Sequence, residues 1–156
     1  MKKALILNFL LFTLNVTNAQ NGFQVIEQNV PYKRFATSFT TNIIGENENF
    51  VMYNWQKFIE KHKGVTYLIS NAEGDVEFES EHVRFPLLDN KLVTIHSRFT
   101  PNSTETGVLL TLWIQMKDGT YYSSKTDEHS ADKIKKWLLT FNEQLMGPTN
   151  LDLNTN

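Results

Sequence analysis

The chain has 156 residues, with 15 Lys and Arg against 17 Asp and Glu and no cysteine. This length suits one domain built around one hydrophobic core. The lack of cysteine excludes disulfide bonds and a thiol nucleophile. The acidic balance argues against a nucleic-acid partner, because phosphate backbones attract basic surfaces.

Residues 1–19 predict a secretory signal peptide. Lys2 and Lys3 precede an apolar run over residues 4–16, and Thr17 and Ala19 are the small residues of a peptidase site. The run is shorter than the ~20 residues of a membrane-spanning helix. We therefore expect cleavage after Ala19, a periplasmic or secreted mature chain with a formal charge of −4 (13 basic against 17 acidic residues), and no membrane span.

The first third of the expected mature chain predicts a strand and then a helix. Residues 20–31 form a polar lead-in, and apolar residues alternate from Tyr32 to Ile43, as they do in a half-buried strand. Residues 46–49 offer capping side chains, and apolar residues at spacings of three and four predict a helix over residues 50–62. We expect Gly64 to end this helix in a left-handed conformation.

Three further strands are expected after this helix. They cover residues 65–70, 75–81 and 92–99, separated by turns at residues 71–74 and 89–90. In the second of them, four carboxylates occupy alternate positions, which places them on one side of an extended chain: Asp75, Glu77, Glu79 and Glu81.

The longest predicted strand covers residues 107–116, where aliphatic residues alternate with other side chains. Asp118-Gly119 predicts a tight type I′ turn, with residues 120–124 as the partner strand. A helix is expected from Ser130, as its N-cap, to the stop at Gly147-Pro148. Residues 149–156 are polar and predict a flexible tail.

Residues 20–148 therefore predict a single α+β domain with one antiparallel sheet of five to six strands. Both helices should pack on its aliphatic face, in the order strand, helix, four or five strands, helix. The opposite face should be open to water or to a ligand. The order resembles that of small exported bacterial domains of TBP-like or helix-grip topology. The resemblance implies a helix–sheet interior that can hold a cavity, here lined by aromatic residues: Trp55, Phe58, Trp137 and Phe141.

The four alternating carboxylates have two readings. Carboxylate oxygens suit Ca²⁺, but alternate residues of a straight strand point in parallel about 7 Å apart instead of converging. The favoured reading is a solvated edge strand that resists aggregation through its charge.

A polar and aromatic patch on the open face is the candidate ligand-binding site. If the strands of Glu77 and Leu92 pair, His96 and Arg98 face the carboxylates, which explains both residues structurally through cross-strand pairs. The functional reading is a surface that holds a sugar or a peptide. Its candidate residues are His96, Arg98, Thr111, Trp113, Glu77 and Glu79, with Gln115 beside them.

No pattern predicts a catalytic residue, a metal site or a cofactor. The four histidines show no ligand spacing, and Ser123 and Ser124 lie in no nucleophile motif. His62 is expected to close a helix end, where its charged form would favour the helix dipole.

Three functions remain open. The leading hypothesis is a non-enzymatic binding module for a small molecule, a glycan or a protein partner. The second is an exported hydrolase that uses His96 and a carboxylate. The third is a structural or assembly module that pairs with another copy of the chain.

Overall fold

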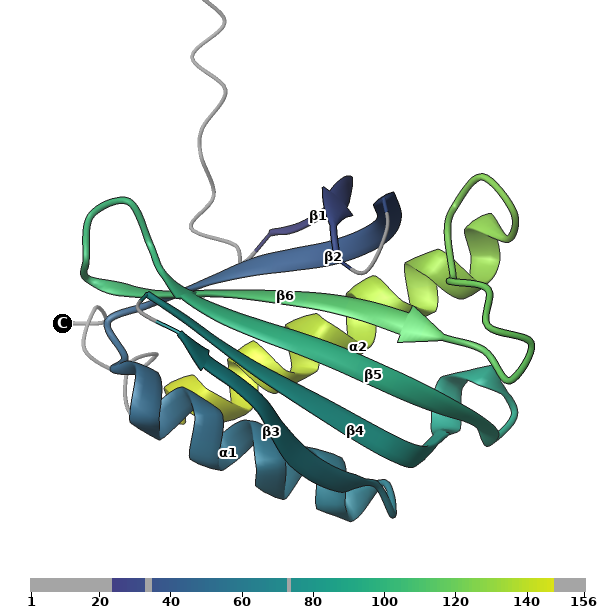
Figure 1. Ribbon diagram of the computed structural model, residues 1–156, viewed down its shortest axis with the longest axis horizontal. Helices are drawn as coiled ribbons and strands as arrows, with labels where there is room; N and C mark the ends of the chain where they lie inside the picture. The colour runs from purple at the N-terminus through teal and green to yellow at the C-terminus, as the bar shows by residue number, and fades with distance from the viewer. Residues whose placement is uncertain (1–23, 33–34, 73, 148–156) are drawn as a thin grey trace, which may run out of the picture.

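A computed structural model describes residues 24–32, 35–72 and 74–147. The expected signal peptide and the expected tail over residues 149–156 lie outside the described residues. The described chain forms one sheet of six antiparallel strands with two helices (Figure 1). This confirms the α+β class predicted from the sequence.

The sheet has the order β1-β2-β6-β5-β4-β3, so β1 and β3 are its edges. The first three strands in the sequence are β1 (Val25–Pro31), β2 (Phe35–Ile44) and β3 (Val65–Ala72). The others are β4 (Asp75–Phe85), β5 (Lys91–Pro101) and β6 (Gly107–Gln115), with a short 3-10 helix η1 (Pro86–Leu88) between β4 and β5.

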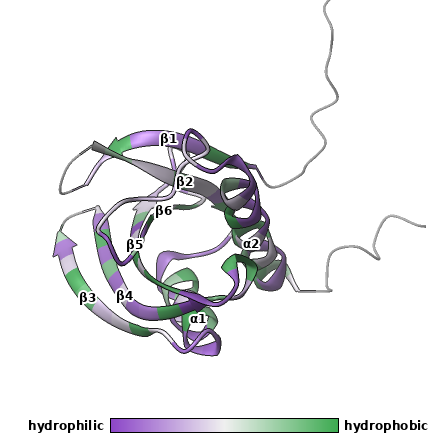
Figure 2. Ribbon diagram, turned by 90° about the vertical axis from the view of Figure 1, so that its right-hand side faces the viewer, coloured by the Kyte–Doolittle hydropathy of each residue, from purple (hydrophilic) through white to green (hydrophobic). Residues whose placement is uncertain are grey.

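Helices α1 (Glu48–Lys61) and α2 (Glu128–Met146) cover the same face of the sheet. Figure 2 shows the strands roughly end-on, with both helices on one side of the curved sheet. Ile134 and Leu138 of α2 are fully buried and belong to one core with Val93 and Leu112 of the strands. Neither helix could bury its apolar stripe alone, so the shared core holds the two layers together.

The aromatic residues between helices and sheet pack directly on one another. The ring of Trp55 lies 5.6 Å from that of Trp137 and 5.0 Å from that of Phe141, and Phe58 lies 4.8 Å from Trp137. Inside this cluster the indole of Trp55 donates to Ser97 Oγ at 2.9 Å. These rings fill the interior with contacts of the geometry that aromatic pairs prefer.

Two strand predictions were wrong. Residues 25–31, taken as part of a polar lead-in, form β1, because pairing with β2 supplies backbone hydrogen bonds that a local pattern does not reveal. Residues 120–124 form only a bridge, Gln115 with Tyr121, and the neighbours of β6 are β2 and β5. The turn is also different: only Gly119 has a positive φ, and Met116 N donates to Thr120 O across a three-residue loop.

The ends of both helices correct the predicted caps. Asn47 caps α1 by accepting from Phe50 N, but Lys63, not Gly64, adopts the left-handed conformation after the helix. Gly64 is required for space, because a Cβ there would lie 2.5 Å from Ile59 Cγ2. At α2 the N-cap is Asp127, whose carboxylate accepts from the backbone N–H of Ser130 at 3.0 Å. Ser130 lies inside the first turn.

Candidate functional site

The face of the sheet opposite the helices, called the reverse face below, brings all six candidate residues together. Strand register places Glu77 opposite Arg98 and Arg98 opposite Thr111. Two residues further along β4, Glu79 lies opposite His96, which in turn lies opposite Trp113 of β6. The six residues form two neighbouring rows across β4, β5 and β6, because side chains at alternate positions share one face.

The first row contains an ion pair supported by an aromatic ring. Arg98 donates to Glu77 Oε1 from Nη2 at 2.7 Å and from Nε at 2.8 Å. The guanidinium lies 5.0 Å from the centre of the Trp113 ring, a cation–π distance. Thr111 ends the row with a hydroxyl contact to Thr40 at 3.0 Å. These contacts hold the guanidinium in one orientation.

The second row is organised around His96, which is only 3% exposed. Its Nδ1 lies 3.1 Å from Glu79 Oε2 and 3.0 Å from the hydroxyl of Tyr32. The amide of Gln115 donates to Gly119 O, which turns its Oε1 toward His96 Nε2 at 3.4 Å. Both nitrogens of the imidazole therefore face oxygen atoms of the protein.

Trp113 is fully buried, so the expectation that this face is open was wrong at its centre. Tyr32, which follows β1, stacks on the Trp113 ring with a centroid distance of 5.0 Å and lies 4.7 Å from the ring of His96. The indole N–H of Trp113 donates to Val30 O at 3.3 Å. The end of the first hairpin therefore covers the centre of the reverse face.

Tyr32 is the residue of this cluster that the sequence analysis missed. Burial, together with the nearby charges of Glu77 and Glu79, raises the pKa of Tyr32 to about 12. Its hydroxyl consequently stays protonated at neutral pH. An aromatic residue at a hairpin end was the available signal, but its contact with His96 spans 64 residues of chain.

The four alternating carboxylates share one side, as predicted, but β4 is not an edge strand. β3 lies outside β4, and partners on β5 offset the charges. Asp75 accepts from the hydroxyl of Thr100 at 2.7 Å, Glu77 pairs with Arg98 and Glu79 contacts His96. Among the described residues, no three His, Asp or Glu side chains converge as a metal site.

His62 closes the end of α1 as expected, but as a neutral group and not in the expected charged form. It is the C-cap of α1, and its Nε2 accepts a hydrogen bond from the indole of Trp137 at 3.2 Å. Burial and the neighbouring charge of Lys61 hold its pKa below the ordinary value of 6.5. The neutral form is therefore the one that the fold uses.

The edge strand β3 presents a different kind of surface. Its eight residues carry no charge. The apolar side chains of this strand are at least half exposed: Val65 50%, Tyr67 50%, Leu68 59% and Ile69 50%. A register shift between Leu68 and Ser70 marks a bulge in its pairing with β4. An exposed apolar edge is a template for another strand.

Comparisons with protein-family models, with curated proteins and with solved structures found no match to this chain. Among the helices of the described residues, none combines the length and the apolar character needed to cross a membrane.

Proposed function

We propose that this chain is a non-enzymatic protein-interaction domain that binds a second copy of itself by adding strand to strand at β3. The observation that carries the proposal is the uncharged edge with four half-exposed apolar side chains. Strand addition would pair the outward backbone groups of β3 and would remove these side chains from water.

The two edges of the sheet differ in a way that favours pairing of β3 with β3. The opposite edge, β1, contains Glu27 and ends at Pro31, which lacks a backbone donor. Charge and proline are features that keep edge strands from pairing. A β3–β3 contact uses the same patch on both copies, so it closes at a dimer and leaves no free apolar edge.

Self-pairing also avoids charge repulsion. The strand has no Asp, Glu, Lys, Arg or His. Three of the four alternating carboxylates of the neighbouring β4 have partners on β5, and the fourth, Glu81, lies 4.0 Å from His82 of its own strand. Two copies could therefore approach along β3 without bringing unpaired carboxylates together.

The hydrolase hypothesis has less support. His96 and Glu79 are in contact, as a general base and its orienting group would be. However, the imidazole is 3% exposed, and both of its nitrogens face protein groups. A substrate would first have to displace the covering Tyr32.

The oligomeric state of the purified full-length gene product tests the proposal. Light scattering after size exclusion should give the mass of a dimer, which should fall toward that of a monomer on dilution. Leu68→Lys should shift the protein to the monomer, because a charge on an edge strand blocks pairing. The matched control is Ile26→Lys on β1, which replaces a side chain of similar exposure (51%) at the other edge.

A wild-type protein that stays monomeric at the highest soluble concentration contradicts the proposal. Equal effects of Leu68→Lys and Ile26→Lys would also contradict it, since they would place the contact elsewhere or on both edges. Thermal unfolding of each variant by circular dichroism shows that a loss of dimer is not a loss of fold.

We further propose that the dimer forms outside the cytoplasm. The support is the pattern of Lys2, Lys3, the apolar run and Ala19. Intact-mass measurement of the processed protein should find Gln20 as its first residue, and a product that retains residues 1–19 contradicts export by this route.

A further inference from the structure

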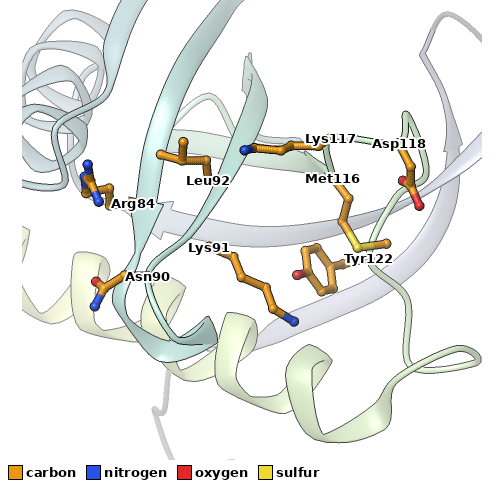
Figure 3. Close-up of a pocket in the computed structure, with 8 residues that line it drawn as sticks. All are labelled: Arg84, Asn90, Lys91, Leu92, Met116, Lys117, Asp118 and Tyr122. Carbon is orange, nitrogen blue, oxygen red and sulfur yellow. The ribbon is translucent and has the colours of Figure 1, made fainter.

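A pocket of about 570 Å³ lies at the end of the sheet where β5 begins and β6 ends (Figure 3). We call it the basic pocket. Its lining combines apolar and charged side chains from the end of β4, the start of β5 with the turn before it, and the segment after β6: Arg84, Asn90, Lys91, Leu92, Met116, Lys117, Asp118 and Tyr122. Its volume is within the range of small-molecule sites.

Three cations line this pocket, and Asp127 lies close enough to Lys91 for the charge of Lys91 to lower the pKa of the Asp127 carboxyl group. Arg84, Lys91 and Lys117 are exposed, and within the described part of the chain none of them forms an ion pair. The carboxylate among the lining residues, Asp118, is already engaged: it accepts from Thr120 N at 2.9 Å and from its hydroxyl at 2.6 Å. The pocket therefore has an excess of positive charge in a protein whose overall formal charge is negative.

The hydroxyl of Tyr122 gives a second, independent indication that a ligand binds in this pocket. The residue is 4% exposed, and its hydroxyl has no hydrogen-bond partner among the described residues. In Figure 3 this hydroxyl points away from the backbone toward the space beside Lys91. A buried hydroxyl without a partner is costly and uncommon in native proteins, so it indicates a water or a ligand atom.

Burial raises the pKa of Tyr122, and the charges of Asp127 and Asp118 raise it further. The hydroxyl is thus a donor at neutral pH. Met116 and Lys91, which line the pocket beside it, are unbranched, and their rotation can open the way to it.

We infer that the basic pocket binds a small organic anion that carries a phosphate or sulfate group on an apolar body. Arg84, Lys91 and Lys117 hold the anionic group, and the hydroxyl of Tyr122 donates to one of its oxygens. Leu92 and Met116 contact the apolar body. This site is separate from the proposed β3 interface and does not depend on it.

Isothermal titration of the purified full-length gene product with phenyl phosphate tests this inference. Saturable binding at one site is expected, weaker for inorganic phosphate, which lacks the apolar body, and absent for benzyl alcohol, which lacks the charge. Each of Arg84→Gln, Lys91→Gln and Lys117→Gln should raise Kd about tenfold, the usual effect of losing one charge-assisted hydrogen bond. Lys136→Gln, an equal charge change on α2 outside the lining, should leave Kd unchanged.

Tyr122→Phe separates binding from stability. The hydroxyl forms no hydrogen bond with any residue that the structure describes, so its removal should not lower the unfolding temperature, but it should raise the Kd for phenyl phosphate several-fold. Absence of saturable binding, or an equal Kd for Lys136→Gln and the three pocket variants, overturns the inference. Cosedimentation with phosphatidylglycerol vesicles that the pocket variants abolish would assign the phosphate group to a lipid; protein that stays in solution would assign it to a free ligand.

Discussion

A buried hydrogen bond between α2 and β2 leads to a specific prediction about the free energy of unfolding. Asn142 and Thr41 are each 1% exposed, and the amide Nδ2 donates to Thr41 Oγ1 at 2.6 Å. The other amide atom, Asn142 Oδ1, is buried and has no partner within the described ranges. The pair therefore makes one hydrogen bond at the cost of desolvating a whole amide group.

The single and double substitutions should not be additive. Thr41→Val keeps the shape of the side chain but leaves the entire amide unpaired, which should cost about 1–3 kcal/mol. Asn142→Leu removes the amide and leaves only the hydroxyl, so its cost should be smaller. The double variant removes both polar groups, and its free energy of unfolding should equal or exceed that of the wild type.

Urea unfolding followed by tryptophan fluorescence measures these differences. A matched control is Thr37→Val, on the same strand, whose hydroxyl donates to the exposed Asn29 at 3.1 Å. That change should cost less than about 0.5 kcal/mol, because water replaces the lost partner. A double variant that loses as much stability as the two single variants together would refute the reasoning.

Three further predictions concern His62, Gly107 and Asp127. Because the folded pKa of His62 lies below 6.5, the unfolded chain binds the proton more readily, and this contribution to stability is lost as pH falls below about 6.5. His62→Gln keeps an acceptor for Trp137, so urea midpoints across this range should depend less on pH than in the wild type, and an unchanged slope contradicts the assignment. Gly107→Ala places a Cβ in collision with the backbone oxygen of Ile43 and should cost about 1–3 kcal/mol in thermal unfolding. Asp127→Ala removes the cap of α2 and should lower the unfolding temperature, measured in the same way.

Local patterns in the sequence predicted the elements whose amphipathic stripe is strong. The periodicity around Trp55 and Trp137 located both helices, and the alternation in residues 75–81 and 107–116 located β4 and β6 with the correct faces. The predicted cross-strand pairs are also present, because Glu77 lies opposite Arg98 and Glu79 lies opposite His96. These features depend on spacing along one strand or helix.

Features that depend on distant pairing were not predictable in this way. β1 has only a weak apolar pattern and exists through its pairing with β2. The segment after Gly119 has strand-like residues, yet the place beside β6 is taken by β2, whose longer pairing buries more side chains. Turn and cap positions differed for the same reason, since they depend on the space left by neighbours such as Ile59 beside Gly64.

Because Tyr32 covers the centre of the reverse face, binding of a ligand there would require displacement of protein contacts. A ligand over His96 or Trp113 would have to break the contacts that Tyr32 makes with both rings, together with the bond from the Trp113 indole to Val30. Those contacts fix the first hairpin on the sheet, so their loss would also weaken the β1–β2 edge. The free energy of such binding would have to exceed that of the displaced cluster. The β3 edge and the basic pocket require no displacement of this cluster, and both lie at the margins of the sheet.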